Sequence, residues 1–146
     1  MRQQGFTLLE VLVAMVIVSI GLVGLAGLMM TSAKNNQSAY YRSQASWLAY
    51  DIVDRMRANR TSALKGDYNI AYQTTASSSN AMALLDLGQW KTELQTALPT
   101  GDGRITFLGN VATVYVRWDD SRGLGLHKIG GYVGNTAQSI SIQTQL

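Results

Sequence analysis

The chain has 146 residues, of which 47% are apolar and 14% charged, a length that suits one compact domain with an appendage. It has no cysteine, which excludes disulfides, and its single histidine, His127, argues against a zinc site. The net charge is +3, but the basic residues are scattered and their one cluster lies beside Asp51 and Asp54, so no direct nucleic-acid partner is expected.

An apolar run dominates the amino-terminal part of the chain. From Phe6 to Met30 the only charged side chain is Glu10. Apart from Arg2, all the other charges lie at Lys34 or beyond. As a helix this run is about 37 Å long, enough to cross a hydrocarbon core of about 30 Å. We therefore expect a membrane-spanning helix here.

A secretory signal peptide is the alternative interpretation of this run, with Thr31-Ser32-Ala33 as its cleavage site. Three features argue against it. The run exceeds the usual apolar region of roughly 7–15 residues, its basic flank is reduced to Arg2, and a carboxylate, Glu10, lies inside it.

Glu10 allows two interpretations. A carboxylate at the centre of a membrane helix costs roughly 2.5–3.5 kcal/mol, and less near an end. Glu10 lies near the start of the run, where the interface and the positive end of the helix dipole would tolerate it. Alternatively, it awaits a cationic partner, since ionisable groups inside membranes are usually paired. Composition leaves both open.

The segment Gly5–Glu10, G-F-T-L-L-E, resembles the processing site of the type IV pilin family, and Met1–Gly5 resembles its short leaders. The resemblance implies that a prepilin peptidase cuts after Gly5 and methylates the new amino terminus at Phe6. It also implies that Glu10 pairs with the terminal amine of a neighbouring subunit. The implied partners are this peptidase, other major and minor pilins, and the pilus assembly machinery of the inner membrane.

Gly21, Gly24 and Gly27 recur every three residues in the run. Small residues allow close packing of helices in membranes, which is the first interpretation. The second is a stretch that melts in the filament, because each glycine lowers helix propensity by about 1 kcal/mol relative to alanine. Major pilins commonly have proline at the position of Gly27, so the departure leaves melting open.

One near-continuous helix is predicted from about Phe6 to about Leu64, with Gly66 as its stop. Its second half has an apolar face at three- and four-residue spacing, which comprises Tyr41, Ala45, Leu48, Ile52 and Met56. We interpret Arg55, Arg57 and Asn59 as a solvated helix face, with a binding patch as the alternative.

Beyond Gly66 the pattern predicts a surface loop to Asn80, then a second helix that Asn80 caps and Pro99 ends. One side of that helix is expected to carry Leu84, Leu87, Trp90, Leu94 and Leu98. A turn over 100–103 precedes strands at Arg104–Leu108, Val111–Asp119 and Ser139–Leu146. On the second strand one face is expected to carry Ala112, Val114, Val116 and Trp118.

The fold expected from these elements, and implied by the resemblance, is α+β and pilin-like. A long amino-terminal helix with an apolar first half packs on a small antiparallel sheet. We expect a leader over residues 1–5, a transmembrane and filament-core helix over 6–33, and a periplasmic head over 34–146 that includes the second half of the long helix. The protein would sit in the inner membrane and then in a surface pilus.

No cofactor, metal or enzyme activity is expected. The glycine-rich loop Asp119–Thr136 lacks the spacing of a phosphate-binding loop, and no catalytic set stands out. Asp102, Asp119 and Asp120 do not have the spacing of a calcium loop. We interpret the loop, which contains Arg122, His127, Lys128 and Tyr132, as a subunit contact or exposed surface.

Several features resemble minor subunits of the family. The chain has no cysteine pair, whereas many major pilins close a loop with a disulfide. The stretches Leu48–Asn59 and Trp118–Asp120 resemble a group of minor pilins that modify pili, which implies a role in priming filament assembly for twitching, adhesion or DNA uptake. The alternatives are a minor pseudopilin of type II secretion and a membrane-anchored binding domain in which Glu10 is incidental.

Overall fold

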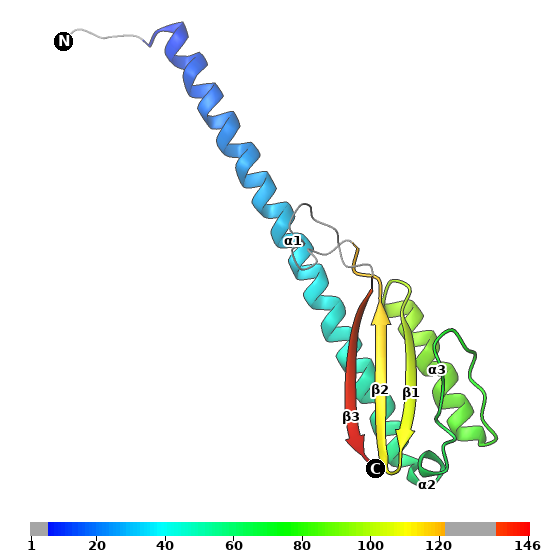
Figure 1. The fold of residues 1–146 in the computed structure, drawn as a ribbon. Coiled ribbons are helices and arrows are strands. Elements are labelled where there is room, and N and C mark those ends of the chain that lie inside the picture. The colour runs from blue at the N-terminus through cyan, green and yellow to red at the C-terminus, as the bar shows by residue number, and fades with distance from the viewer. Residues whose placement is uncertain (1–5, 122–136) are drawn as a thin grey trace.

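The computed structural model describes residues 6–121 and 137–146. A single helix projects far from a two-layer head, and the amino terminus lies at the distant end of that helix (Figure 1). The helices are α1 (Leu8–Ala58), α2 (Arg60–Leu64) and α3 (Ala81–Ala97), and the strands are β1 (Asp102–Leu108), β2 (Val111–Trp118) and β3 (Gln138–Gln145). The predicted α+β, pilin-like fold is confirmed.

The long helix α1 covers 51 residues and begins at a capped turn. The Thr7 hydroxyl accepts a hydrogen bond from the backbone N–H of Glu10 at 3.3 Å, which satisfies one of the unpaired donors at a helix start. No proline or glycine interrupts the chain between Gly27 and Gly66. The apolar run therefore continues as helix into the head.

The predicted near-continuous helix to about Leu64 is interrupted at one residue, Asn59. Asn59 leaves the helical conformation, with φ −113° and ψ 46°, and the short helix α2 follows it. The Asn59 side-chain amide donates to the Tyr68 hydroxyl at 3.2 Å and to Asn80 Oδ1 at 3.3 Å. These two bonds to distant segments hold the Asn59 side chain at the point where α1 ends.

Gly66 follows the short helix α2 and ends the helical region, as predicted. Its φ of +87° lies in the left-handed region that suits glycine. The Gly66 N–H donates to Ala63 O at 2.9 Å, and the Asp67 N–H donates to Ser62 O at 3.1 Å. This pair of bonds is the Schellman motif, which satisfies carbonyls left free at a helix end.

The sheet has the order β1-β2-β3 with both pairs antiparallel. The predicted alternation on β2 is confirmed, since its inner face is buried and comprises Ala112, Val114, Val116 and Trp118. β1 starts at Asp102, two residues before the predicted start, because Asp102 pairs with Arg117 in the β1–β2 register. β3 is half-buried on its inner face and exposed on its outer face.

The helix α3 has the predicted cap, with Asn80 Oδ1 accepting from the Ala83 N–H at 3.0 Å, and ends before Pro99. Of the five residues expected on one side of α3, Leu84 is 41% exposed and the other four are buried. The buried face of α3 also includes Ala83 in the first turn and Lys91. Leu84 lies about 60° around the helix from Leu87, at the edge of the buried face.

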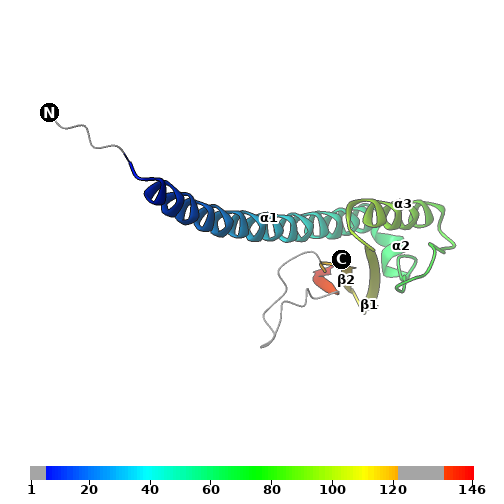
Figure 2. The ribbon, with the colours of Figure 1, turned by 90° about the horizontal axis from the view of Figure 1, so that it is seen from above.

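Both α1 and α3 cover the same face of the sheet (Figure 2). The predicted apolar face of α1 is buried there, apart from Tyr41, which is half-buried. Trp90 of α3 is fully buried at the centre, and its indole N–H donates to Leu48 O at 2.9 Å. Gly103 of β1 lies against the Trp90 ring, where any Cβ would overlap it. Within α1, therefore, only the second half contributes to the core.

The loop between α2 and α3 differs in part from the expected surface loop. Tyr68 and Ile70 within it are buried, and Ile70 forms a backbone bridge to Ile105 of β1. The loop thus adds cover to the edge of the sheet at β1.

Candidate functional site: the exposed amino-terminal helix

We call residues 6–33 the stalk. Each of its residues is exposed, and the large apolar side chains from Phe6 to Met30 are between 47% and 83% exposed. The most apolar stretch of α1 has a mean hydropathy of 2.7 and none of it is buried in the head. Monomeric soluble proteins rarely expose apolar surface on this scale. By length and composition the stalk is able to cross a membrane, as expected from the sequence.

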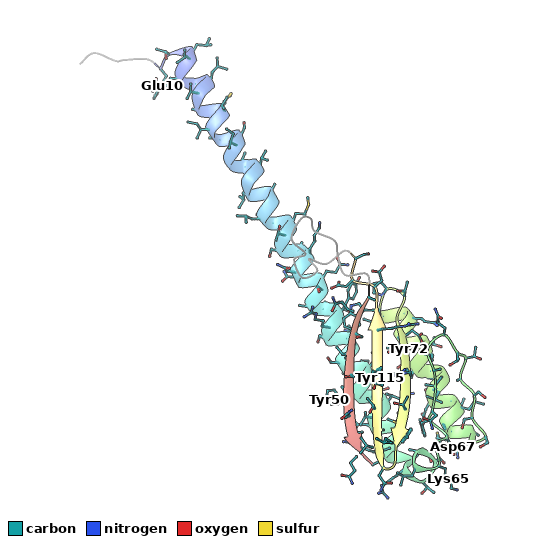
Figure 3. The ribbon with its side chains drawn as sticks, viewed as in Figure 1. Glu10, Tyr50, Lys65, Asp67, Tyr72 and Tyr115 are labelled. Atoms are coloured by element: carbon teal, nitrogen blue, oxygen red, sulfur yellow. The ribbon has the colours of Figure 1, made fainter. Side chains whose placement is uncertain are left out.

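Glu10 lies at the end of the stalk that is farthest from the head (Figure 3). Its carboxylate forms no ion pair within residues 6–121 and 137–146. The first basic side chain further along α1 is Lys34, about 36 Å away at the rise of a helix. A cation that pairs with Glu10 must therefore come from outside the described part of this chain.

The residues around Glu10 form an apolar face. Phe6, Glu10, Ala14 and Val18 follow one another at four-residue spacing, and they line a shallow hollow along the helix. Phe6 is 83% exposed and lies just before the Thr7 cap. The structure thus places Phe6 and Glu10, two of the predicted site residues, within one turn of the helix start. Gly5 and the rest of the predicted leader lie outside the described residues.

The three stalk glycines lie in continuous α-helix. A Cβ built at Gly21, Gly24 or Gly27 has nothing within 4 Å. Their small size therefore serves no contact with residues 6–121 or 137–146. Close packing against another helix remains a prediction.

The head contains a charged cluster that the sequence pattern did not reveal. Lys91 Nζ lies 2.6 Å from Asp102 Oδ1, and it also donates to the carbonyls of Gly103 at 2.7 Å and Ala71 at 3.0 Å. Asp102 Oδ2 accepts from Arg117 at 3.0 Å. Burial raises the pKa of Asp102, but the bond from Lys91 and the other hydrogen bonds outweigh it and lower that pKa overall. These contacts join α3, β1 and β2, which is a structural role.

The same contacts bear on the calcium alternative. Asp102 is occupied by two cations of the chain, Asp119 Oδ1 accepts from the Ser121 N–H at 2.8 Å, and Asp120 Oδ2 accepts from the Ser38 hydroxyl. Within the described residues, no group of three potential ligands gathers. The predicted subunit contact at Arg122, His127, Lys128 and Tyr132 lies outside the described residues.

The basic cluster on α1 is divided between two environments. Arg55 joins α1 to α3, since its guanidinium lies 2.7 Å from Asp51, 3.8 Å from Asp86 and 3.3 Å from Glu93. Arg57 pairs with Asp54 at 3.1 Å at the exposed surface. Arg55 is therefore part of the packing of the head, so the predicted solvated face is wrong for Arg55 and correct for Arg57. The alternative of a free binding patch is not supported.

Residues 1–26 of the chain match the family model described as the prokaryotic N-terminal methylation motif. The match includes Gly5, Phe6 and Glu10 together with most of the stalk. No curated protein and no solved structure gives a significant match to the chain.

Proposed function

We propose that this chain, whose residues 1–26 carry the N-terminal methylation motif of type IV pilins and pseudopilins, is a minor pilin of a type IV pilus. The motif implies processing by a prepilin peptidase and assembly with other pilins, so the protein is a structural subunit and not an enzyme. In our proposal the peptidase cuts between Gly5 and Phe6 and methylates Phe6. The mature subunit waits in the inner membrane and then enters the filament.

The observation that carries this proposal is a fully exposed apolar stalk with one carboxylate at its tip. In the membrane, lipid covers the apolar side chains. In a filament, stalks of other subunits cover them instead, and the small side chains of Gly21, Gly24 and Gly27 permit close approach. The stalk therefore exchanges one apolar environment for another, with little change in the hydrophobic free energy.

Glu10 would fix the axial position at which the incoming stalk is held. Cleavage after Gly5 would create an amine at Phe6, next to the start of α1 and near the depth of a neighbour's Glu10. Two opposite charges in a medium of low dielectric constant reduce each other's cost of desolvation. A stalk displaced by one helical turn, about 5.4 Å, would leave both charges unpaired. We infer that this pair sets the axial register of the incoming subunit.

The assignment to minor pilins of the PilV kind is supported by the stretch Leu48–Asn59. It forms the part of α1 that packs against α3, and its Arg55 connects the two helices. By that resemblance, the protein primes or modifies pilus assembly together with other minor pilins, in support of twitching motility, adhesion or DNA uptake. A minor pseudopilin of type II secretion shares the stalk and is the alternative outcome of the test.

The test replaces Glu10 by alanine, with Ser19→Ala as a matched change in the stalk. We expect both variants to be processed and to reach the membrane in wild-type amounts. Removing one partner of a buried ion pair costs about 3–5 kcal/mol, and each 1.4 kcal/mol is about a factor of ten in association. Sheared pili should therefore contain at least about tenfold less of the Glu10→Ala subunit, and normal amounts of Ser19→Ala.

Wild-type amounts of Glu10→Ala in the pili would contradict the role of Glu10. If the unmodified chain is absent from pili and its deletion blocks protein secretion instead, it is a pseudopilin.

A further inference from the structure

The two edges of the sheet are treated differently, and the covered edge is at β1. The N–H of Ile105 donates to Ile70 O at 3.0 Å, and the N–H of Ile70 donates to Ile105 O at 3.2 Å. One pair earlier along β1, the carbonyl of Gly103 accepts from Lys91 Nζ at 2.7 Å and its N–H donates to Asp102 Oδ1 at 2.8 Å. The loop before α3 and the Lys91 side chain thus occupy this edge.

The edge at β3 is open in the part of the chain that the structure describes. The Leu146 N–H donates to Asn110 O at 3.0 Å, and the β2–β3 register continues from there without interruption. Antiparallel pairs alternate between bonded and non-bonded, so the even-numbered residues of β3 bond to β2. The odd-numbered residues direct their N–H and C=O groups away from the sheet; they are Ser139, Ser141, Gln143 and Gln145.

The sequence and register of β3 themselves contain none of the usual protection against pairing. Exposed edge strands are normally shortened, bulged, or marked with proline or charge. β3 covers 8 residues, Q-S-I-S-I-Q-T-Q, with no charge and no proline, and its register with β2 contains no bulge. Its outer row of serine and glutamine side chains is exposed. The strand is thus suited to accept another strand.

An exposed aromatic ring flanks the open edge. Arg57 of α1 donates to Thr144 Oγ1 at 2.9 Å, and Tyr50 lies two helical turns before Arg57 on the same face, about 10 Å back along the helix. That position is level with Ser141, and Tyr50 lies beside β3 (Figure 3). Tyr50 is 58% exposed, and Ile142 on the inner face of β3 is only half-buried. An added strand would cover both.

We propose that β3 takes up an extended segment of another filament subunit as a fourth strand of the sheet. The main chain of that segment would bond to the outward N–H and C=O groups of β3, which is strand addition. Its side chains would alternate, with uncharged polar groups beside Ser141 and Gln143, and apolar groups against Ile142 and Tyr50. This inference rests on the proposed function, since it places the partner in the filament.

The direction of the stalk excludes one candidate for the added strand. α1 runs in the same direction as β3, because Arg57 meets Thr144 and Arg60 meets Leu146 further on. A second copy of β3 paired antiparallel would point its stalk the opposite way. Stalks that enter one membrane from the same side cannot do so. The segment is therefore not an antiparallel copy of β3.

Amide hydrogen exchange of the full-length processed chain tests the proposal, first dispersed in detergent and then in sheared filaments. In detergent, the odd-numbered amides from Ser139 to Gln145 should exchange fast, while Ile140, Ile142 and Thr144 are protected by β2. In filaments, the odd-numbered amides should slow by at least about tenfold, which corresponds to about 1.4 kcal/mol. Fast exchange in filaments would overturn the proposal. Protection already present in detergent would also overturn it, because the chain's own residues then occupy the edge.

A matched pair of variants tests the same edge in cells. Ser141→Pro removes an outward N–H, a change that edge strands tolerate, and Ser141→Ala keeps that N–H. We expect Ser141→Pro to be about tenfold depleted from filaments, and Ser141→Ala to match the unmodified chain. If Ser141→Pro is folded and fully incorporated, strand addition is wrong, and if it fails to fold, the exchange experiment decides. Absence of the unmodified chain from filaments would instead defeat the proposed function.

Discussion

The two halves of α1 differ in what covers them, although they belong to one helix. Leu48 in the second half is 1% exposed beneath the sheet and α3, whereas Leu22 in the first half is 61% exposed. The head therefore stabilises itself, while the stalk depends on an apolar environment supplied from outside. This difference separates the stability of the folded head from the capacity to assemble, and each can be changed without the other.

The largest expected effect comes from the same truncation made in both halves. Leu48→Ala removes a buried side chain and should destabilise the head by about 2–5 kcal/mol. Leu22→Ala should change the unfolding free energy in detergent by less than about 0.5 kcal/mol, because its side chain is exposed and lies outside the core of the head. Chemical denaturation of the two variants measures both values. Equal losses would mean that the stalk packs on the head.

A smaller effect is expected where a charged pair joins elements of the head. Asp102→Asn removes the carboxylate that Lys91 and Arg117 share. Hydrogen bonds to charged groups contribute about 1.5–3 kcal/mol, so this variant should lower the free energy of unfolding by about that amount. Asp54→Asn is the control, since Asp54 is exposed and its bond to Arg57 should contribute less than about 1 kcal/mol. An equal loss in both variants would contradict a structural role for the Asp102 cluster.

The pH dependence of this pair has a definite sign. The pKa of Asp102 is lowered in the folded head, so its contribution is fully present above about pH 3.9, the usual value for aspartate. The contribution is lost as the pH falls below that value through the lowered pKa. The difference in stability between the unmodified chain and Asp102→Asn should therefore be constant from about pH 5 to 7 and shrink in stronger acid.

The smallest effect is expected at Tyr68, which is fully buried and donates to Asp86 at 2.5 Å. Tyr68→Phe should cost about 1.5 kcal/mol at neutral pH, the lower end of the range for hydrogen bonds to charged groups, because the Asp86 carboxylate keeps Arg55 nearby at 3.8 Å. Burial, together with the bond to Asp86, raises the pKa of Tyr68 to about 12. The folded head thus holds this proton more tightly, so the stability that it contributes is lost as the pH rises between about 10 and 12. Burial also raises the pKa of Tyr72, so ultraviolet titration should show two of the 7 tyrosines ionising late, and only one of the two in Tyr68→Phe.

Much of the head followed from local patterns. The alternation on β2 depends only on which face of the strand each residue occupies, and the cap at Asn80 depends on a residue three positions further on. Both were therefore predicted from the sequence. The end of α1 at Asn59 was not, because it depends on Tyr68 and Asn80 from distant segments. Lys91 was missed for a related reason: a buried lysine is stabilised only by the carboxylate and carbonyls that the fold brings to it.

The functional features also divide into one that the sequence predicted and one that it did not. The segment Gly5–Glu10 is a contiguous motif next to an apolar run, so it was recognisable without a structure. The open edge of β3 was not, since its amino acids also suit a central strand. Its exposure depends on the phase of hydrogen bonding with β2 and on Ile70 and Lys91 covering the opposite edge.

The central claim is that the stalk becomes part of a filament after the chain is cut before Phe6. Mass spectrometry of the amino-terminal peptide from sheared filaments tests it most directly. Our account predicts a peptide that begins at methylated Phe6. A chain that retains Met1, or one that begins at Lys34, would contradict it.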